Sequence, residues 1–363
     1  MRVALVHEFL TQLGGAERVL LNFHELFPEA PVYTLVYDEQ KTQGVFANLD
    51  IRPSFLQSAT KIIRNYKWFL PLMPWATERF DFQDYDLVLS DSSAFAKGVL
   101  VKRPTLHVCY CHTPTRYLWE SMEEYVANLP YGQLVKFMVK PYLKYFFKPW
   151  DYKAAQRPDY FIANSRTVQK RIKKYYGRNS TVIYPPVNTH FFSLESKKEN
   201  YFLTVSRLES YKKNPLVVEA FNQLGWSLKI AGEGSEFEKL KRAARPNIEF
   251  LGRVPEENLP KLYQEAKAFV FPALEDAGIV VLEALSCGTP VIGFCQGGTA
   301  EFVRDGENGV LFDRQTADDL IRALQRFSMS SFSPEKLRDS ILEYDCGNFR
   351  KKILNFIENA HRN

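Results

Sequence analysis

Short apolar runs alternate with amphipathic stretches in a regular order through the second half of the chain. The apolar runs are rich in β-branched and aromatic residues and predict strands. Stretches with an apolar residue at every third or fourth position predict helices. The predicted strands cover residues 201–206, 227–232, 247–252, 267–273 and 290–294, and the predicted helices cover 215–224, 236–244, 259–266 and 277–288. This alternation across short loops predicts a parallel sheet with crossover helices.

The first half of the chain begins with the same order of elements and then becomes less regular. Strands are predicted at residues 2–9, 32–37, 86–92, 107–112 and 160–165, and a first helix at 16–27. We therefore predict an α/β protein with two doubly wound domains that face each other across a cleft and bind ligands at strand carboxyl ends. The stiff segment at Tyr184-Pro185-Pro186 is the predicted boundary. It gives an N-terminal domain at 1–184, a C-terminal domain at 185–345 and a final helical segment at 346–363.

Length and composition agree with this organisation. The chain has 363 residues, of which 45% are hydrophobic and 25% charged, and these values suit two globular domains. We expect no signal peptide, because the first apolar run is short, and no transmembrane helix, because no stretch of about 20 apolar residues occurs. The five cysteines show neither a disulfide framework nor the spacing of a zinc site. These features predict a cytosolic protein without a metal or other cofactor.

Positive charge is concentrated in the first half of the chain. Residues 1–185 contain 24 lysines and arginines against 17 aspartates and glutamates, a net charge of +7, whereas the remainder has a net charge of −2. This imbalance predicts an anionic partner for the first domain.

Part of the excess charge lies in a basic and aromatic stretch between residues 136 and 150. Lysines recur there every four residues and aromatic side chains lie between them, a pattern that suits a helix on an anionic membrane surface. The alternative is that the aromatic side chains belong to the core and the lysines are solvated. The candidate membrane contacts are Lys136, Lys140, Lys144, Phe146, Phe147, Lys148 and Trp150.

The densest chemical signal is a pair of glutamates between a predicted strand and the body of a predicted helix. Glu275 and Glu283 are eight residues apart, or about 12 Å along a helix, which is wider than the paired carboxylates of many glycoside hydrolases. Backbone N–H groups of Gly278, Ile279 and Val280 would be unpaired at the helix start and could bind an anion. This arrangement suits one carboxylate on a sugar, one on a ribose and a diphosphate between them. The alternative is two ordinary surface carboxylates.

Two cations follow the first predicted strand of the second domain. Arg207 comes directly after that strand, and Lys212 lies in the loop before the next helix. Cations at a strand end can neutralise a departing diphosphate, as a magnesium ion does in other enzymes. The alternative is a solvated basic loop.

Glycines and a histidine mark other strand ends. Gly14 and Gly15 separate the first predicted strand from the first helix and permit a donor to approach the backbone closely. They do not form the GxGxxG pattern of a dinucleotide site. His112 ends a predicted strand and could hydrogen-bond a donor sugar, or it could be a satisfied, partly buried histidine. Gly297-Gly298 repeats the order of strand, glycine and helix, either as part of a site or as a turn.

Taken together, these residues resemble the retaining GT-B glycosyltransferases of family four. The resemblance covers most of the chain and rests on Glu275-x7-Glu283, Arg207 with Lys212, Gly14-Gly15, His112 and Gly297-Gly298-x-x-Glu301. Its most specific part is the segment 273–312, and the start of the chain is similar to a bacterial branch that includes O-antigen and exopolysaccharide mannosyltransferases. The chain departs from the family pattern at Asn188, where an aspartate is common, and at Ser206, where a glycine usually precedes the arginine.

The resemblance implies two Rossmann-like domains, with the last helix crossing back to the first domain. It also implies that Arg207 and Lys212 bind the donor diphosphate, Glu283 the ribose and Glu275 the donor sugar, with His112 beside the sugar at the reaction centre. The implied reaction is retaining, metal-independent transfer of a hexose to a lipid-linked saccharide acceptor in bacterial cell-surface polysaccharide synthesis. Similarity to the mannosyltransferase branch points to mannose from GDP-mannose.

Two other functions remain as alternatives. A nucleotide-sugar epimerase of the same architecture would need no lipid acceptor, so the basic aromatic stretch would have no purpose. A non-catalytic module that binds anionic lipid would not need carboxylates and cations grouped around a phosphate site. We expect a peripheral protein on the inner face of the cell membrane, with no nucleic-acid partner.

Overall fold

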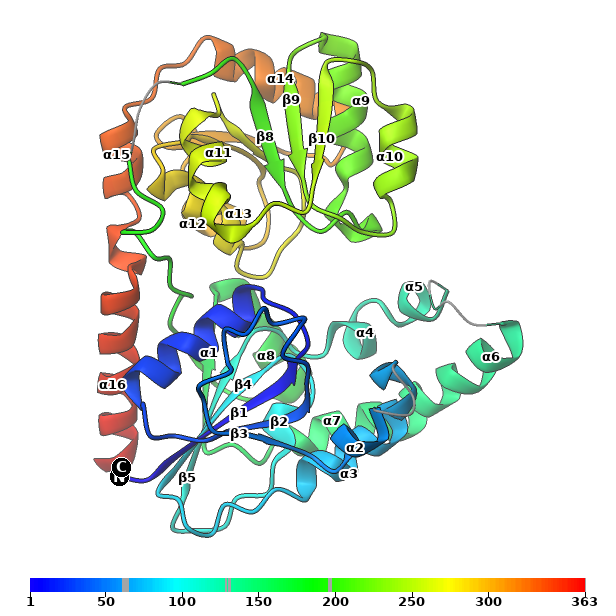
Figure 1. Cartoon of the computed structure of the whole chain (residues 1–363), viewed down its shortest axis with the longest axis vertical. Coiled ribbons are helices and arrows are strands. Elements are labelled where there is room, and N and C mark those ends of the chain that lie inside the picture. Colours follow the sequence, from blue (N-terminus) through cyan, green and yellow to red (C-terminus); the bar gives the residue numbers. More distant parts are fainter. Residues whose placement is uncertain (61–64, 128, 130–131, 195–197, 363) are drawn as a thin grey trace. The chain divides into compact units, whose positions relative to one another are not determined.

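The structure is a computed structural model that describes residues 1–60, 65–127, 129, 132–194 and 198–362. The chain divides into two compact units (Figure 1). Unit 1 comprises Met1–Tyr184 together with Arg350–Asn363, and unit 2 comprises Pro185–Phe349. Each unit is built around its own parallel sheet, and the two are described separately below.

Unit 1 contains seven described strands in the order β3-β2-β1-β4-β5-β6-β7, and every neighbouring pair is parallel. The order reverses between β1 and β4, as in other doubly wound sheets. The strands are β1 (Val3–Leu10), β2 (Val32–Tyr37), β3 (Ile51–Pro53), β4 (Leu87–Ser92), β5 (Leu106–Cys111), β6 (Tyr160–Ala163) and β7 (Thr181–Val182).

Helices surround the sheet of unit 1 and include an arm that extends away from it (Figure 1). The α-helices are α1 (Gly15–Leu26), α2 (Leu56–Thr60), α3 (Met73–Glu78), α4 (Arg116–Trp119), α5 (Met122–Ala127), α6 (Gln133–Tyr142), α7 (Lys148–Ala154), α8 (Arg166–Tyr176) and α16 (Cys346–Arg362). Short 3₁₀ or π turns are η1 (Tyr66–Leu72), η2 (Ala96–Gly98) and η3 (Leu143–Phe147). The last helix, α16, joins unit 1 through an ion pair of Arg350 with Glu25 on α1 and through the buried side chains of Ile353 and Ile357.

Unit 2 contains six described strands in the order β10-β9-β8-β11-β12-β13, again all parallel. The strands are β8 (Phe202–Val205), β9 (Leu228–Ala231), β10 (Ile248–Gly252), β11 (Phe269–Phe271), β12 (Val291–Phe294) and β13 (Gly309–Phe312). The helical elements are η4 (Ser210–Lys212), α9 (Asn214–Leu224), α10 (Phe237–Ala243), η5 (Glu256–Asn258), α11 (Leu259–Glu265), α12 (Ile279–Ser286), α13 (Thr299–Phe302), α14 (Ala317–Ser328), α15 (Pro334–Asp339) and η6 (Leu342–Tyr344).

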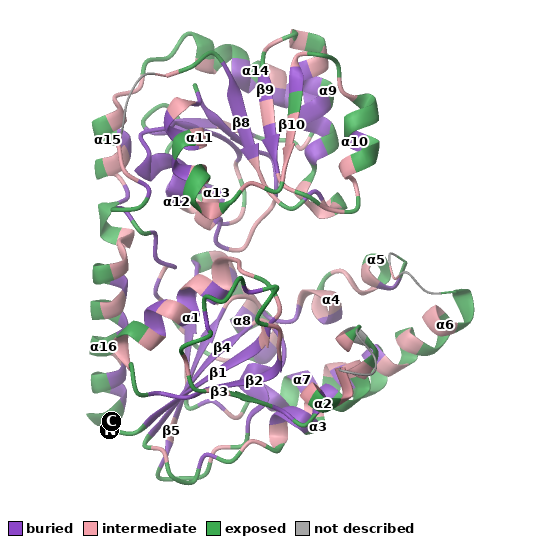
Figure 2. Ribbon diagram, viewed as in Figure 1, coloured by how far each residue is buried: buried purple, intermediate pink, exposed green. Residues whose placement is uncertain are grey.

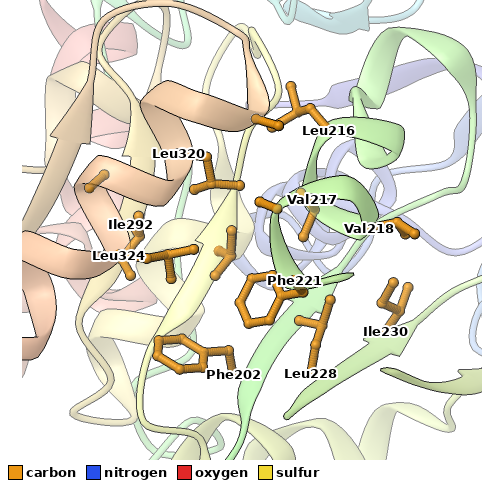
Figure 3. Packing of buried hydrophobic residues seen from close by; sticks show 14 of the residues in the cluster. Phe202, Leu216, Val217, Val218, Phe221, Leu228, Ile230, Ile292, Leu320 and Leu324 are labelled. Atoms are coloured by element: carbon orange, nitrogen blue, oxygen red, sulfur yellow. The ribbon is translucent and has the colours of Figure 1, made fainter. Parts of the chain in front are cut away.

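The core of unit 2 lies between its sheet and the helices α9 and α14. Phe221 from α9 and Leu324 from α14 meet Phe202, Leu228 and Ile292 from the strands (Figure 3). Apart from the edge strand β10, the strands of unit 2 are almost wholly buried (Figure 2), because helices cover both faces of a parallel sheet. This explains why the strand sequences are continuous apolar runs, and it leaves the strand-end loops as the places for polar chemistry.

The predicted α/β fold with two doubly wound sheets is confirmed. Every strand predicted from an apolar run is present. Three strands were missed, at Ile51–Pro53, Thr181–Val182 and Gly309–Phe312. Two of them have only two or three residues, and all three lie at sheet edges, where a strand needs less apolar surface. Among the described helices, none is long and apolar enough to cross a membrane.

Candidate functional site

The predicted residues of unit 2 lie where the strand order reverses. β8 and β11 are neighbours in the middle of the sheet, and a loop follows the carboxyl end of each. The loop after β8 contains Arg207 and Lys212, and the loop after β11 contains Glu275. Open α/β sheets bind ligands at such a point, because the loops diverge there and leave a crevice.

Lys212 and Glu275 form an ion pair that joins these two loops. Lys212 Nζ lies 2.6 Å from Glu275 Oε1, and both side chains are largely shielded from solvent. Lys212 Nζ also lies 5.7 Å from the centre of the Phe271 ring at the end of β11. Shielding strengthens the attraction relative to an exposed ion pair. The structure therefore brings two of the predicted site residues into direct contact.

Arg207 lies in the same loop and is exposed. Its Nη2 donates a hydrogen bond to the Tyr211 hydroxyl at 2.8 Å, and among the described residues Tyr211 is the one hydrogen-bond partner of the guanidinium. A guanidinium has five N–H donors, so most of those on Arg207 are available to a ligand.

The helix after Glu275 begins at a glycine in the left-handed region of backbone space. Gly278 is the N-cap of α12, with φ 65° and ψ 49°, a conformation that glycine adopts without steric cost. The N–H groups of Ile279 and Val280 that follow have no acceptor within the helix. Together with the positive end of the helix dipole they favour an anion.

Glycines hold both loops in place through direct contact between backbones. A Cβ on Gly297 would lie 2.4 Å from the carbonyl oxygen of Glu275, and the N–H of Gly298 donates to that oxygen at 2.7 Å. A Cβ on Gly232 would lie 1.9 Å from the carbonyl oxygen of Ser206 in the loop after β8. The Gly297-Gly298 segment is therefore a turn that supports the Glu275 loop.

Glu283 is in different surroundings from Glu275. Its residue is only 1% exposed, and its Oε2 accepts a hydrogen bond of 3.0 Å from the Tyr263 hydroxyl on α11. The carboxylate that we expected to contact a ribose is therefore not at the surface of the chain.

In unit 1, His112 is one end of a chain of four side chains that begins beside α1. His112 follows β5, and its Nε2 contacts Asp91 Oδ1 on β4. Asp91 Oδ2 lies 2.8 Å from His7 Nδ1 on β1, and His7 Nε2 lies 3.8 Å from Glu17 Oε1 on α1. His7, Asp91 and Glu17 are buried, whereas His112 is partly exposed. The sequence places these residues far apart, and the register of β1, β4 and β5 brings them together.

The three buried members, His7, Asp91 and Glu17, keep one another charged. Burial by itself would lower the pKa of His7, but the hydrogen bond to Asp91 and the nearby charge of Glu17 raise it to about 10. Burial would raise the pKa of Asp91, but attraction to His112 and hydrogen bonds from both histidines lower it. The pKa of Glu17 is likewise lowered, because its contact with His7 outweighs burial. At neutral pH, His7 is thus a cation between two carboxylates.

The predicted glycine loop is attached to the same chain. Gly14 is the N-cap of α1, and its N–H donates to Glu17 Oε2 at 2.9 Å. Gly15 is the first residue of the helix. The loop at the end of β1 is therefore fixed by the side chain that also contacts His7.

A second buried carboxylate near the end of β1 is occupied by donors of the protein. Glu8 Oε1 accepts hydrogen bonds from the Ser92 hydroxyl at 3.0 Å and from the N–H groups of Ser93 at 2.8 Å and Ala96 at 3.3 Å. Glu8 therefore supports the loop after β4.

Asp151 on α7 is the centre of a buried polar cluster in unit 1. Its oxygens accept from Lys97 Nζ and the Thr115 hydroxyl, each at 2.6 Å, from Trp119 Nε1 at 2.7 Å and from the Tyr176 hydroxyl at 2.9 Å. Since a buried charge requires partners, the cluster fixes α7 against the loops after β4 and β5.

The predicted basic and aromatic stretch forms α6, η3 and α7. No residue of α6 is buried, and Figure 2 shows the helix as exposed or intermediate along its length. The most exposed apolar side chains of this stretch are those of Phe137 at 77%, Leu134 at 73% and Phe146 at 68%. Lys140 and Lys144 are also exposed, and Lys140 pairs with Glu123 at 2.8 Å. This arm thus presents aromatic and cationic side chains to solvent.

Part of the predicted membrane contact is wrong. Phe147 is fully buried and stacks on Phe95, with ring centres 5.0 Å apart. Trp150 is partly buried, and its Nε1 donates to Glu78 at 2.8 Å. These two side chains lie on the face of η3 and α7 that packs against the rest of unit 1. Two of the predicted lysine contacts are also partly buried, Lys148 and Lys136. Lys136 Nζ donates a hydrogen bond to the carbonyl oxygen of Ala127 at 2.5 Å.

The sequence did not single out His7, Asp91, Lys97 or Asp151. One signal was available, because His7 and Asp91 are ionisable residues in strands that begin as apolar runs. Their pairing depends on strand register, which the sequence pattern does not fix. Within the described part of the chain, no group of three or more His, Cys, Asp or Glu side chains is placed to hold a metal ion.

Two family profiles match consecutive parts of the chain. The profile described as Glycosyltransferase Family 4 matches residues 13–191, and the profile described as Glycosyl transferases group 1 matches residues 187–344.

Individual relatives are distant. The chain is 27% identical over 182 residues to an uncharacterized glycosyltransferase of Methanocaldococcus jannaschii, which covers 49% of this chain and 50% of that protein. It is 33% identical over 113 residues to the O-antigen chain mannosyltransferase B of Escherichia coli, which covers 31% of this chain and 27% of that protein. The matched segments thus span half or less of the length of these relatives.

Solved structures share the fold over the whole chain. Sucrose-phosphate synthase from Thermosynechococcus elongatus superimposes with a TM-score of 0.76 at 16% identity and covers 99% of both chains. Anabaena HepE in complex with UDP-glucose gives a TM-score of 0.71 at 17% identity, with 99% of this chain and 100% of that chain covered. These likenesses assign the GT-B fold.

Proposed function

We infer that this chain, which belongs to the family 4, group 1 glycosyltransferases, is a retaining hexosyltransferase that uses a nucleotide-diphosphate sugar. We propose mannose from GDP-mannose as the transferred sugar and a lipid-linked saccharide as the acceptor, in the synthesis of a bacterial cell-surface polysaccharide. The support for mannose is the similarity to O-antigen chain mannosyltransferases of Escherichia coli and Salmonella typhimurium.

One observation carries the proposal. The Lys212–Glu275 ion pair, 2.6 Å long, stands at the strand-order reversal of unit 2, and the chain continues from Glu275 directly into the start of α12. A cation, a carboxylate and an anion-binding helix start at one sheet edge suit a sugar joined to a diphosphate.

The residues of the site divide the work of binding the donor. We propose that Arg207, Lys212 and the N–H groups at the start of α12 bind the diphosphate, and that Glu275 binds the sugar once the diphosphate has taken Lys212. We also propose that Glu283 binds the ribose of the donor nucleotide, as the family resemblance implies. Because the Tyr263 hydroxyl now donates to Glu283, a ribose hydroxyl would have to replace it.

Transfer with retention follows from that arrangement. The acceptor hydroxyl attacks the anomeric carbon on the face from which the diphosphate leaves, so the new C–O bond forms where the old one breaks. The proton of the acceptor hydroxyl passes to the leaving phosphate oxygen. Arg207 and Lys212 stabilise the negative charge that develops on that oxygen, and loss of one such contact typically costs about 3 kcal/mol of transition-state stabilisation. We assign His112 to the transferred sugar, with Gly14 and Gly15 as further donor contacts.

We also propose that the arm formed by α6 and η3 lies on an anionic membrane surface at the inner face of the cell membrane. The exposed Phe137 and Phe146 side chains would enter the interface, and Lys140 and Lys144 would meet the lipid headgroups. A lipid-linked acceptor is held in that same membrane.

A thermal-shift screen with GDP-, UDP- and dTDP-sugars tests the donor. We expect GDP-mannose to raise the unfolding temperature, because a ligand at 100 times its Kd adds about 2.7 kcal/mol of stability. Conversion of the sugar nucleotide without an acceptor would instead indicate an epimerase. No shift with any of the nucleotides, together with binding to anionic vesicles, would indicate a non-catalytic lipid-binding module.

A further inference from the structure

The buried chain in unit 1 has a direction that ends at His112. Glu17 contacts His7, His7 contacts Asp91, and Asp91 contacts His112. Asp91 is fully buried and contacts a histidine with each of its two oxygens. The one partly exposed member of the chain is His112, so this is where the chain can meet a ligand.

The contact between Asp91 and His112 selects one nitrogen of the imidazole. An ionised carboxylate has no proton to donate, so the nitrogen that faces Asp91, Nε2, carries the hydrogen. The other nitrogen, Nδ1, is then the one left for a ligand. In the described part of the chain, Asp91 is the one residue that hydrogen-bonds the imidazole of His112.

His7 allows Asp91 to keep its charge in a fully buried position. Without a partner, a buried carboxylate would take up a proton, because burial disfavours the charged form. The His7 Nδ1 contact of 2.8 Å provides positive charge next to Asp91 Oδ2. Glu17 in turn balances His7, and it also holds the N–H of Gly14.

We propose that Asp91 and His7 are positioning residues that hold the His112 ring with Nε2 toward the sheet and Nδ1 toward the transferred sugar. This inference rests on the proposed function, which assigns His112 to that sugar. Glu17 extends the same support to the Gly14 loop, so one buried chain fixes two elements of the donor-binding surface of unit 1.

His107, on the strand that precedes His112, is a histidine with a purely structural role. His107 on β5 is buried, and its Nε2 lies 2.9 Å from the Ser90 hydroxyl on β4. Burial, with the charges of Arg157 and Arg178, lowers the pKa of His107 to about 3, so this ring is neutral. Ser90 and Asp91 are adjacent on β4, yet the first contacts a neutral core histidine and the second contacts two histidines at the strand ends. They therefore form a matched pair of positions for substitution.

The test compares Asp91→Asn with Ser90→Ala in the full chain. We expect GDP release from GDP-mannose to show kcat about 10²-fold lower in Asp91→Asn, with KM for the donor nearly unchanged, because the tautomer and orientation of His112 are no longer fixed. Ser90→Ala should keep kcat, since it removes a buried hydrogen bond between β4 and β5 without altering Glu17, His7, Asp91 or His112. His7→Gln, which leaves the Asp91–His112 contact in place, should lower kcat by about tenfold.

Imidazole N–H protons give a readout that loss of stability alone would not move. Protons held against a buried carboxylate exchange slowly with water, so ¹⁵N-labelled histidine should show the N–H signals of His7 and His112 in the wild type. Asp91→Asn should lose the signal of His112, and Ser90→Ala should keep it. The signals are assigned with His112→Gln.

Several results would overturn the inference. These are a folded Asp91→Asn protein with wild-type kcat, an equal loss of kcat in Ser90→Ala, or no protected His112 proton in the wild type. The last measurement needs only His112→Gln for the assignment, so it decides the matter even if Asp91→Asn fails to fold. If the wild type turns over neither GDP-mannose nor UDP-glucose, the proposed function fails. The proton signals still show whether Asp91 and His7 hold the imidazole ring of His112.

Discussion

Several charged side chains are buried in unit 1, and those described above have partners inside the protein. Lys97 is matched by Asp151, and His7 by Asp91 and Glu17. Removing one member of a buried ion pair typically lowers the free energy of unfolding by about 3–5 kcal/mol, because its partner is left as an uncompensated charge. These positions should therefore tolerate substitution poorly for reasons of stability as well as function.

The raised pKa of His7 makes an alkaline loss of stability predictable. A group whose folded pKa lies above its unfolded value stabilises the protein fully below pH 6.5, and this contribution is lost as the pH rises toward about 10. We expect the free energy of unfolding of the wild type to fall more steeply between pH 7 and 10 than that of His7→Gln. Urea unfolding at several pH values measures this difference. Parallel curves for the two proteins would mean that His7 is not a cation in the folded state.

How far single site residues could be predicted depends on how each is placed. Arg207 and Glu275 follow predicted strands directly, so the rule for strand carboxyl ends was enough to bring them to one sheet edge. Phe146 and Phe147 are adjacent and chemically alike, yet one is exposed and the other is buried, because the phase of a helix decides which side chain faces the core. The pairing of His7 with Asp91 required the register of two strands 84 positions apart, and no local pattern specifies that register.

At the scale of elements, the loops of unit 2 that we assign to the donor depend on neighbouring turns. The Gly297-Gly298 turn contacts the backbone of the Glu275 loop with no room for a side chain. This explains why glycines stand there.

Alanine substitution of two glycines separates backbone strain from contact. Gly297 and Gly306 have φ of 72° and 82°, so alanine at either position carries a similar strain of about 1–2 kcal/mol. Only at Gly297 would the new Cβ collide, 2.4 Å from the Glu275 carbonyl oxygen, because nothing lies within 4 Å of such an atom at Gly306. We expect Gly297→Ala to weaken GDP-mannose binding at least about tenfold, or about 1.4 kcal/mol, and Gly306→Ala to leave it unchanged. Equal affinities in a titration of the two folded variants would contradict this role of the turn.

The arm of α6 and η3 is the element that we assign to the membrane, and its exposed aromatic side chains can be tested directly. A phenylalanine that passes from water to an apolar environment gains about 1.5–3 kcal/mol. We therefore expect the double substitution Phe137→Ser and Phe146→Ser to weaken binding to phosphatidylglycerol vesicles at least about tenfold. Sedimentation with vesicles measures this.

Met329→Ser is the control for that measurement, because Met329 is 82% exposed but lies on unit 2, outside the arm. It should sediment like the wild type. Neutral phosphatidylcholine vesicles should bind all of these proteins weakly, since the lysines then have no anionic partner. Equal binding of the double variant and the wild type to phosphatidylglycerol would exclude the arm as the membrane contact.

The sheets were more predictable than the arm for a physical reason. Strands buried on both faces need continuous apolar runs, and such runs are visible in the sequence. Residues 51–53 and 181–182 form edge strands too short to show a run. In the arm, apolar residues face both the core and solvent, so the sequence shows aromatic content but not which side chains are covered.

At the scale of the whole molecule, the two halves of the sequence carry different charge. The first half, with a net charge of +7, contains the arm that we assign to an anionic membrane, and the second half, with a net charge of −2, contains the loops that we assign to the donor diphosphate. On this assignment, the second half would attract a nucleotide diphosphate through a few placed groups and not through its net charge. This makes single cations of the donor site decisive for binding.

The most direct test is isothermal titration of GDP into the whole chain in the presence of EDTA. We expect the wild type to bind GDP without a divalent ion, and Arg207→Ala to bind at least about tenfold more weakly with its unfolding temperature unchanged, since a charge-assisted hydrogen bond contributes about 1.5–3 kcal/mol. Lys261→Ala, which removes an exposed lysine of α11, should bind like the wild type. Absence of GDP binding until magnesium is added, or equal affinities of the wild type and a folded Arg207→Ala protein, would contradict a diphosphate site built from the protein's own cations.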